Sequence, residues 1–159
     1  MPDFPGLIPS TMADQRIITA SASRLSARLF NYLSIGTTLL SATLYTLGQT
    51  LGNTKLAFLP LAMSLPPIMI WVAASMFVYA AIAHHPNLRV RHYNKWAGYR
   101  YYAIIGLLVV VANDAAHVVG WGGIWIFFVL ALVPWASYDI WKAGREAWQD
   151  TIIEANAND

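Results

Sequence analysis

Four long apolar stretches restrict what this chain can fold into. They cover about residues 29–47, 56–83, 101–119 and 124–140. Each is close to the ~20 residues that a helix needs to cross ~30 Å of hydrocarbon. Strand patterns of alternating hydrophobicity are absent, and backbone inside a bilayer must satisfy its own hydrogen bonds, so helices are predicted. The sequence therefore predicts an all-α, polytopic membrane protein, a four-transmembrane-helix bundle.

The composition agrees with this class. Of the 159 residues, 57% are hydrophobic and 11% are charged, which is too few charges to cover a soluble globule. We divide the chain into an N-terminal arm with an interfacial helix (1–28), the bundle (29–142) and a C-terminal tail (143–159) that begins as a surface helix. The helix of the N-terminal arm either lies at the interface or extends the first apolar stretch inward. Ser10 or Thr11 is predicted to cap the interfacial helix. The chain has no cysteine, which excludes disulfides and thiolate metal sites.

Basic residues are distributed unevenly between the two predicted sides of the membrane. Three arginines precede the first stretch, four bases lie between the second and third, and two follow the fourth, against Lys55 alone on the other side. Lys and Arg near spans stay in the cytoplasm, so both termini are predicted to be cytoplasmic, or on the matrix side if the protein is mitochondrial. Residues 16–28 have some of the serine and arginine content of a mitochondrial targeting segment, but Asp3 and Asp14 argue against that interpretation.

Residues 84–102 interleave bases with aromatic side chains. At a bilayer surface, Tyr and Trp settle among the head groups while Lys and Arg meet anionic lipid. The predicted head-group contacts are Arg89, Arg91, Lys95, Trp96 and Arg100. Anionic lipids on the cytoplasmic side are thus an expected partner, and the high isoelectric point requires no nucleic acid. An RNA-binding patch would need a stacking platform that this loop is too short to build.

Two prolines, Pro66 and Pro67, stand about halfway along the second stretch. Each deletes one helical hydrogen bond, so a kink is predicted near Ser64. The freed carbonyl groups of Ala62 and Met63 then need other partners. Prolines inside a membrane helix most often produce a bend that only shapes the bundle. The alternative is that the bend opens a cavity.

The first stretch and the last loop predict how the helices pack. Small and hydroxyl residues cover much of the first stretch, which favours close helix contacts inside the bundle. The sequence GWGG at residues 120–123 leaves room only for a tight hairpin, so the third and fourth stretches are predicted to be antiparallel neighbours.

The third stretch contains a polar cluster, Asn113, Asp114 and His117, within the segment VVVANDAAHVV. On a helix these side chains fall within about 100° of one face. A rise of ~1.5 Å per residue places them ~22 Å from the inner surface, in the outer leaflet. An ionised group exposed to lipid there costs several kcal/mol, so the cluster is predicted to face protein or a water-filled cavity.

Three roles are open for this cluster. It can form an internal clasp, in which Asp114 and His117 satisfy each other and borrow hydroxyl groups from Thr43, Tyr45 or Thr46 of the first stretch. Alternatively, Asp114 can pair with Lys55 across the bundle. In the third role, Asp114 and His117 bind or move a metal ion, a proton or a quinone head group. No second histidine lies at this depth to complete a familiar metal site.

Two classes of function follow. The first is a non-catalytic subunit or organiser of a membrane protein complex, with other membrane protein subunits as partners. The second is a small membrane-embedded enzyme or redox subunit of the oxidoreductase type, acting on a lipid-soluble substrate, with Asp114 and His117 as catalytic groups. The cofactor is left open between none, a metal and a quinone. Asp139 is interpreted as a structural residue that pairs with Lys142 one turn later.

Overall fold

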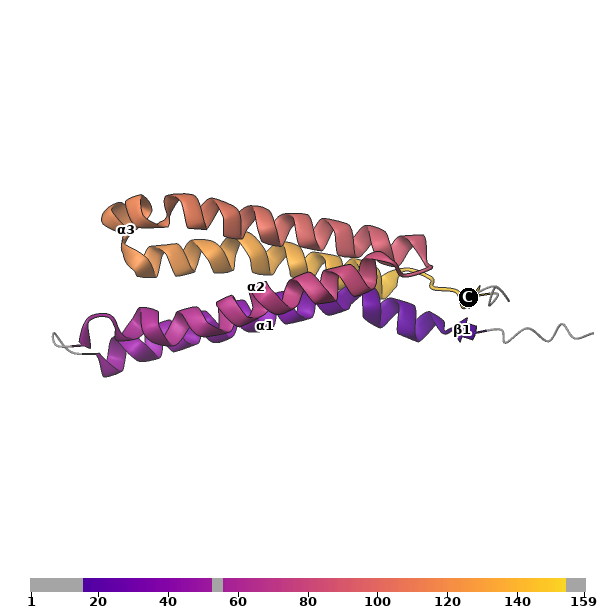
Figure 1. The fold of residues 1–159 in the computed structure, drawn as a ribbon, viewed down its shortest axis with the longest axis horizontal. Helices are drawn as coiled ribbons and strands as arrows, with labels where there is room; N and C mark the ends of the chain where they lie inside the picture. Colours follow the sequence, from indigo (N-terminus) through magenta and orange to yellow (C-terminus); the bar gives the residue numbers. More distant parts are fainter. Residues whose placement is uncertain (1–15, 53–55, 154–159) are drawn as a thin grey trace, which may run out of the picture.

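The computed structural model describes residues 16–52 and 56–153, which form three helices and two short strands. In chain order these are β1 (Arg16–Ile18), α1 (Ala20–Leu51), α2 (Leu59–Ala83), α3 (Leu88–Arg145) and β2 (Thr151–Ile153). Figure 1 shows the helices side by side in an elongated bundle. The predicted helical class is confirmed. Three helices are counted rather than the four predicted, because the third and fourth apolar stretches both lie in α3, whose helical backbone is broken at Gly120.

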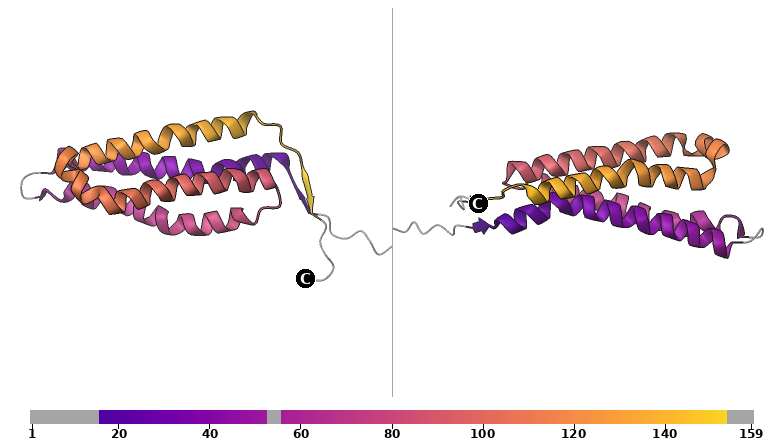
Figure 2. Two further views of the ribbon diagram at one scale, coloured as in Figure 1. Left: turned by 90° about the horizontal axis from the view of Figure 1, so that it is seen from above. Right: turned by 180° about the vertical axis from the view of Figure 1, so that it is seen from behind.

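The helix α3 doubles back on itself at Gly120. This residue has φ 70° and ψ 164°, a region that only glycine occupies without strain. Figures 1 and 2 show the two resulting parts of α3 running antiparallel next to each other. We call residues 88–119 the first arm and residues 121–145 the second arm. The predicted hairpin is confirmed, and its turn lies at the first glycine of the GWGG sequence.

The helix α1 lies at the centre of the bundle. It contacts both α2 and α3 extensively, whereas α2 and α3 touch each other much less. Its buried positions recur every three or four residues and so form one stripe. They are Ser23, Ala27, Phe30, Asn31, Ser34, Thr38, Ser41, Tyr45 and Gly48. The small and hydroxyl side chains of this stripe let the neighbouring helices come close, as predicted for the first apolar stretch.

The start of α1 distinguishes the two alternatives predicted for the N-terminal arm. Thr19 is the N-cap, and its hydroxyl accepts a hydrogen bond from the backbone N–H of Ala22 at 3.2 Å. Residues 20–28 belong to the same helix as the first apolar stretch, which agrees with the predicted inward extension rather than with a separate interfacial helix. Residues 16–18 were predicted to be helical as well, but they form β1. Ser10 and Thr11, the predicted caps, lie outside the described residues.

The two ends of the described chain pair with each other. β1 and β2 form an antiparallel sheet in which Arg16 lies opposite Ile153 and Ile18 opposite Thr151. The C-terminal tail was predicted as a surface helix, but its β-branched residues favour the extended conformation seen here. Figure 2 shows the strand pair at one end of the bundle. Both described ends therefore lie at the same end of the molecule.

The helix α2 continues through Pro66 and Pro67. The hydroxyl of Ser64 donates a hydrogen bond to the carbonyl oxygen of Leu61 at 3.3 Å. This bond does not involve the carbonyl groups of Ala62 and Met63, which are the ones that the prolines free. The predicted kink near Ser64 does not interrupt the helix.

Aromatic side chains fill the middle of the bundle. The ring centroid of Phe30 lies 5.5 Å from that of Trp71 and 5.9 Å from that of Tyr101, and all three side chains are buried. Such tilted and edge-to-face pairs add about 1 kcal/mol each beyond the area that they bury. Phe30 thus ties α1 to α2 and to the first arm of α3.

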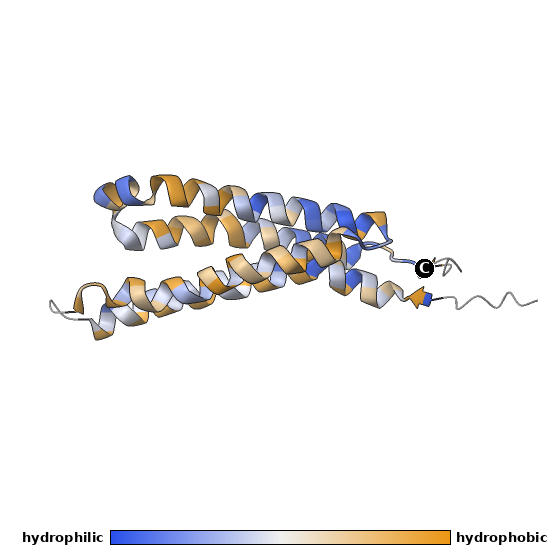
Figure 3. Cartoon of the chain, viewed as in Figure 1, coloured by the Kyte–Doolittle hydropathy of each residue, from blue (hydrophilic) through white to orange (hydrophobic). Residues whose placement is uncertain are grey.

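Two of the helices in the described ranges, α2 and α3, are long and apolar enough to cross a membrane. The helix α1 has 32 residues, but its many serines and threonines make it less apolar. The prediction of long apolar helices is confirmed for these two helices, and the number of membrane crossings stays a prediction. Figure 3 shows hydrophilic residues gathered at the end of the bundle that carries the strand pair, with a smaller hydrophilic patch at the far end of α3.

Two serines on the buried stripe of α1 are expected to respond differently to substitution by alanine. The Ser34 hydroxyl accepts a hydrogen bond from the Trp71 indole N–H at 3.1 Å, whereas the Ser41 hydroxyl has no partner among the described residues. Ser34→Ala should lower the free energy of unfolding by about 1–3 kcal/mol, since it leaves a buried donor unpaired. Ser41→Ala should leave it unchanged or higher. Denaturation curves in detergent measure both, and equal losses would contradict the assignment.

Candidate functional site

The predicted polar cluster lies on the surface of the first arm of α3. Asn113, Asp114 and His117 are all exposed, close to the turn at Gly120. None of the three forms a hydrogen bond or ion pair with another described residue. The chain therefore gathers the cluster on one face, as predicted, but does not cover that face with its own described helices.

The predicted clasp between this cluster and α1 is not formed. The Thr43 and Thr46 hydroxyls donate to carbonyl oxygens of their own helix, those of Leu39 and Thr43, at 2.8 Å each. The Tyr45 hydroxyl accepts from the side-chain amide of Gln49 at 2.9 Å. Threonine commonly bonds to a carbonyl of the preceding turn, so these hydroxyls are already used. Lys55, the other predicted partner, lies outside the described residues.

The metal role predicted for Asp114 and His117 lacks a third ligand within residues 16–52 and 56–153. No group of three or more His, Cys, Asp or Glu side chains is close enough there to hold an ion. The pair is thus an exposed imidazole and an exposed carboxylate on an apolar helix.

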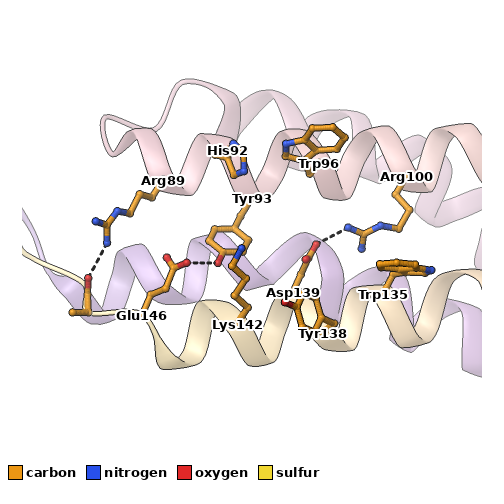
Figure 4. Close-up of a pocket in the computed structure, with 11 residues that line it drawn as sticks. Arg89, His92, Tyr93, Trp96, Arg100, Trp135, Tyr138, Asp139, Lys142 and Glu146 are labelled. Atoms are coloured by element: carbon orange, nitrogen blue, oxygen red, sulfur yellow. Dashed lines mark hydrogen bonds and ion pairs between the residues drawn. The ribbon is translucent and has the colours of Figure 1, made fainter.

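A second set of predicted residues does come together in a cavity. This inter-arm pocket has a volume of about 640 Å³ and lies between the two arms of α3, toward the end that carries the strands (Figure 4). Its lining is Arg89, His92, Tyr93, Trp96, Arg100, Trp135, Tyr138, Asp139, Lys142, Glu146 and Ala147. Of the five predicted head-group contacts, Arg89, Trp96 and Arg100 line the pocket. Arg91 and Lys95 are exposed outside it.

An ion pair between the arms closes one side of the pocket. Arg100 Nη2 on the first arm lies 2.6 Å from Asp139 Oδ2 on the second, and the side chains are 21% and 15% exposed. The pairing of Asp139 with Lys142 that the sequence suggested is wrong, and the carboxylate pairs across the hairpin instead. Asp139 keeps a structural role, but it joins two arms rather than two turns of one helix.

A hydrogen bond between Tyr93 and Glu146 closes the other side. The Tyr93 hydroxyl donates to Glu146 Oε1 at 2.7 Å (Figure 4). Burial is the main reason why the pKa of Tyr93 is raised, and the neighbouring Glu146 carboxylate raises it further. The phenol therefore keeps its proton and remains a donor across the physiological pH range. One oxygen of Glu146 is left without a partner among the described residues.

The turn after α3 forms the rear wall of the pocket. Arg89 Nη1 donates to the backbone carbonyl of Ala147 at 3.1 Å, and the buried Trp148 indole donates to the carbonyl of Ala143 at 2.7 Å. The Ala143 carbonyl belongs to the last turn of α3, where carbonyl groups lack partners within the helix, and Trp148 satisfies it. The Arg89 bond holds the chain that leaves α3 against the first arm.

Two positive groups of the pocket keep unused donors. Arg100 Nη1 is buried and has no hydrogen-bond partner among the described residues. Lys142 takes part in no hydrogen bond or ion pair with a described residue. The lining has three permanently positive side chains, with Arg89 as the third, against the two carboxylates of Asp139 and Glu146. The arrangement can therefore bind an anion.

Sequence reasoning missed the half of this pocket that the second arm supplies. Trp135, Tyr138 and Lys142 are scattered at the end of an apolar stretch and give no motif. A signal was nevertheless present in the hairpin. Arg100 and Asp139 lie at nearly the same number of residues on either side of Gly120, so folding the chain at that glycine places them opposite each other.

Comparison with known proteins adds no relative to this description. The chain matches no protein family, no curated protein and no solved structure.

Proposed function

We propose that this chain is an integral membrane protein that serves as a non-catalytic subunit or organiser of a membrane protein complex. In this proposal α1, α2 and the two arms of α3 are four crossing segments, with both described ends on the cytoplasmic side. The bases gathered at the end that carries the strands support this orientation, because such residues remain in the cytoplasm.

The observation that carries the proposal is the exposed polar cluster. Asp114 follows Arg100 by fourteen residues on one helical arm, a rise of ~21 Å, which is inside a hydrocarbon layer of ~30 Å. An ionisable group exposed there costs about 3 kcal/mol. The described helices leave Asp114 and His117 uncovered. Contact with a second protein chain would remove that cost, so the cluster favours a partner subunit.

The surface around the cluster suits a partner helix. Gly106, Val110, Asn113 and His117 recur at spacings of four, three and four residues, and all are exposed. An alanine in place of Gly106 would meet no atom within 4 Å, so this side of the arm is open. Small residues with polar side chains on the same stripe are typical of helix contacts inside membranes.

A second candidate, the membrane enzyme or redox subunit, is favoured by one different observation. An apolar groove of about 710 Å³ lies between α2 and α3, and its lining includes Met69, Met76, Trp121 and Phe128. A lipid-soluble substrate such as a quinone fits this lining by its chemistry. Asp114 and His117 are not part of the lining, however, so the groove and the candidate catalytic groups are separate.

The experiment that tests the proposal compares Asp114→Asn and His117→Ala with the wild type by native mass spectrometry in a mild detergent. We expect the wild type in an assembly larger than one chain and both variants as dissociated single chains, with unchanged thermal unfolding. His84→Ala is the control, since His84 is exposed near the other end of the bundle.

Other outcomes would decide against a subunit role. A wild type that is a single chain in native membrane extracts contradicts it, as do variants that keep the wild-type assembly. Metal analysis and an absorbance spectrum then test the enzyme alternative. A bound chromophore or metal that is lost in His117→Ala would support that alternative.

A further inference from the structure

The inter-arm pocket lies where the polar end of the bundle meets its apolar part. Arg100 is the last base of the first arm, and the apolar stretch begins at the next residue. From these positions and the unused donors, we infer that the pocket binds the head group of an anionic phospholipid, with the phosphate held by Lys142 and Arg100. This inference rests on the membrane location proposed above.

The donors that remain free in the pocket match a phosphate group. Arg100 donates from Nη2 to Asp139, whereas its Nη1 is buried and has no partner among the described residues. A buried donor without a hydrogen bond costs about 1–3 kcal/mol. Figure 4 shows Arg100 and Lys142 on opposite arms, both reaching into the gap between the arms, with Lys142 beside the Tyr93 ring and Asp139 drawn between the two bases. A phosphate group in this gap can accept from the guanidinium with one oxygen and from the ammonium group with another. Such charge-assisted bonds are about twice as strong as neutral ones.

The rim of the pocket favours a lipid over a soluble anion. Trp96, Trp135 and Tyr138 line the pocket and are between 52% and 62% exposed. Half-exposed tryptophan and tyrosine side chains settle at the head-group level of a bilayer. Leu107 lies about two helical turns beyond Arg100 on the same face of the first arm and is also exposed. An acyl chain can follow this apolar face while the phosphate stays in the pocket.

The carboxylates of the pocket add a preference for a head group with hydroxyl donors. Asp139 is occupied by Arg100, but Glu146 uses only Oε1, for Tyr93. Its second oxygen is free to accept a hydrogen bond from a glycerol-type head group. The phosphocholine head group is a zwitterion without net charge and has no hydroxyl donor to offer, so phosphatidylcholine should be retained less than phosphatidylglycerol.

The test uses the full chain in nanodiscs of equal parts phosphatidylglycerol and phosphatidylcholine. Native mass spectrometry counts the lipids that stay bound after release in about 1 M salt, where a Debye length of ~3 Å suppresses surface attraction. We expect retained phosphatidylglycerol on the wild type and a roughly 10-fold loss of retention in Lys142→Gln, an exposed residue whose change should not affect folding. Arg91→Gln is the matched control, because Arg91 is an exposed base of the first arm outside the pocket.

Each outcome is decisive. If Lys142→Gln and Arg91→Gln retain equal amounts of phosphatidylglycerol, the pocket is not the binding site. If the wild type retains the two lipids equally, the preference for an anionic lipid is wrong. Glycerol phosphate is then added in solution as a soluble competitor that has the same phosphate but no acyl chains. If it displaces the lipid at equal concentration, the pocket binds a soluble phosphate and the lipid assignment is wrong. A chain that fails to enter these nanodiscs refutes the membrane proposal instead, so the two failures are distinguishable.

Discussion

Replacing Gly48 with alanine is expected to separate α1 from the start of α2. A Cβ atom at this position would lie 2.5 Å from Pro60 Cα and 2.9 Å from Pro60 N. Both are backbone atoms, so no rotamer change relieves the clash, and the two helices have to move apart. Overpacking of this kind costs about 1–3 kcal/mol, and a contact with rigid backbone belongs at the upper end of that range. Denaturation curves in detergent measure the loss.

Gly36 provides the matched control on the same helix. A Cβ atom there meets nothing within 4 Å. Gly36→Ala should leave the free energy of unfolding unchanged or raise it by up to about 1 kcal/mol, since alanine is the better helix former. A Gly48→Ala variant as stable as Gly36→Ala would mean that Gly48 and Pro60 are not in contact.

The second large effect is expected at the ion pair between the arms of α3. Arg100→Leu leaves the Asp139 carboxylate, which is 15% exposed, without its partner at 2.6 Å. Removal of one member of a buried ion pair costs about 3–5 kcal/mol, and the partial exposure of this pair reduces the expected loss to about 2 kcal/mol. Because the pair joins the arms, the second arm should also exchange its amide hydrogens faster, which hydrogen exchange with mass spectrometry detects.

The double variant Arg100→Leu with Asp139→Leu separates the charge from the packing. With both members replaced, no unpaired carboxylate remains, and most of the lost stability should return. If the double variant is as unstable as the sum of the two single variants, the side chains do not interact, and the geometry of the hairpin at this level is wrong.

Much of the architecture could be predicted because apolar length and small-residue patterns are local signals. The buried stripe of α1 follows from its Ser and Thr spacing, and the reversal of α3 follows from the glycines after Val119. The strand pair could not be predicted in this way. Three-residue strands such as Thr151–Ile153 have no periodicity to detect, and their pairing depends on where the helices place the two ends.

The site was predictable only in part, for a related reason. Arg89, Trp96 and Arg100 are close together in the sequence and indicate a head-group surface. Asp139, which pairs with Arg100, and Glu146, which bonds to Tyr93, come from the far side of the hairpin, so their positions depend on its register. The cluster around Asp114 shows the opposite limit. Helical spacing correctly placed its members on one face, but spacing within one helix does not tell whether another segment of the same chain covers that face.

The strand pair has a consequence for the connectivity of the molecule. Because Arg16 lies opposite Ile153, the two ends of the described chain are neighbours, and a short linker could join them without moving any helix. A circularly permuted chain, opened at the short connection between α2 and α3, should therefore still assemble the same bundle. Two halves of a split fluorescent protein attached to the two ends would meet on the same side and complement each other.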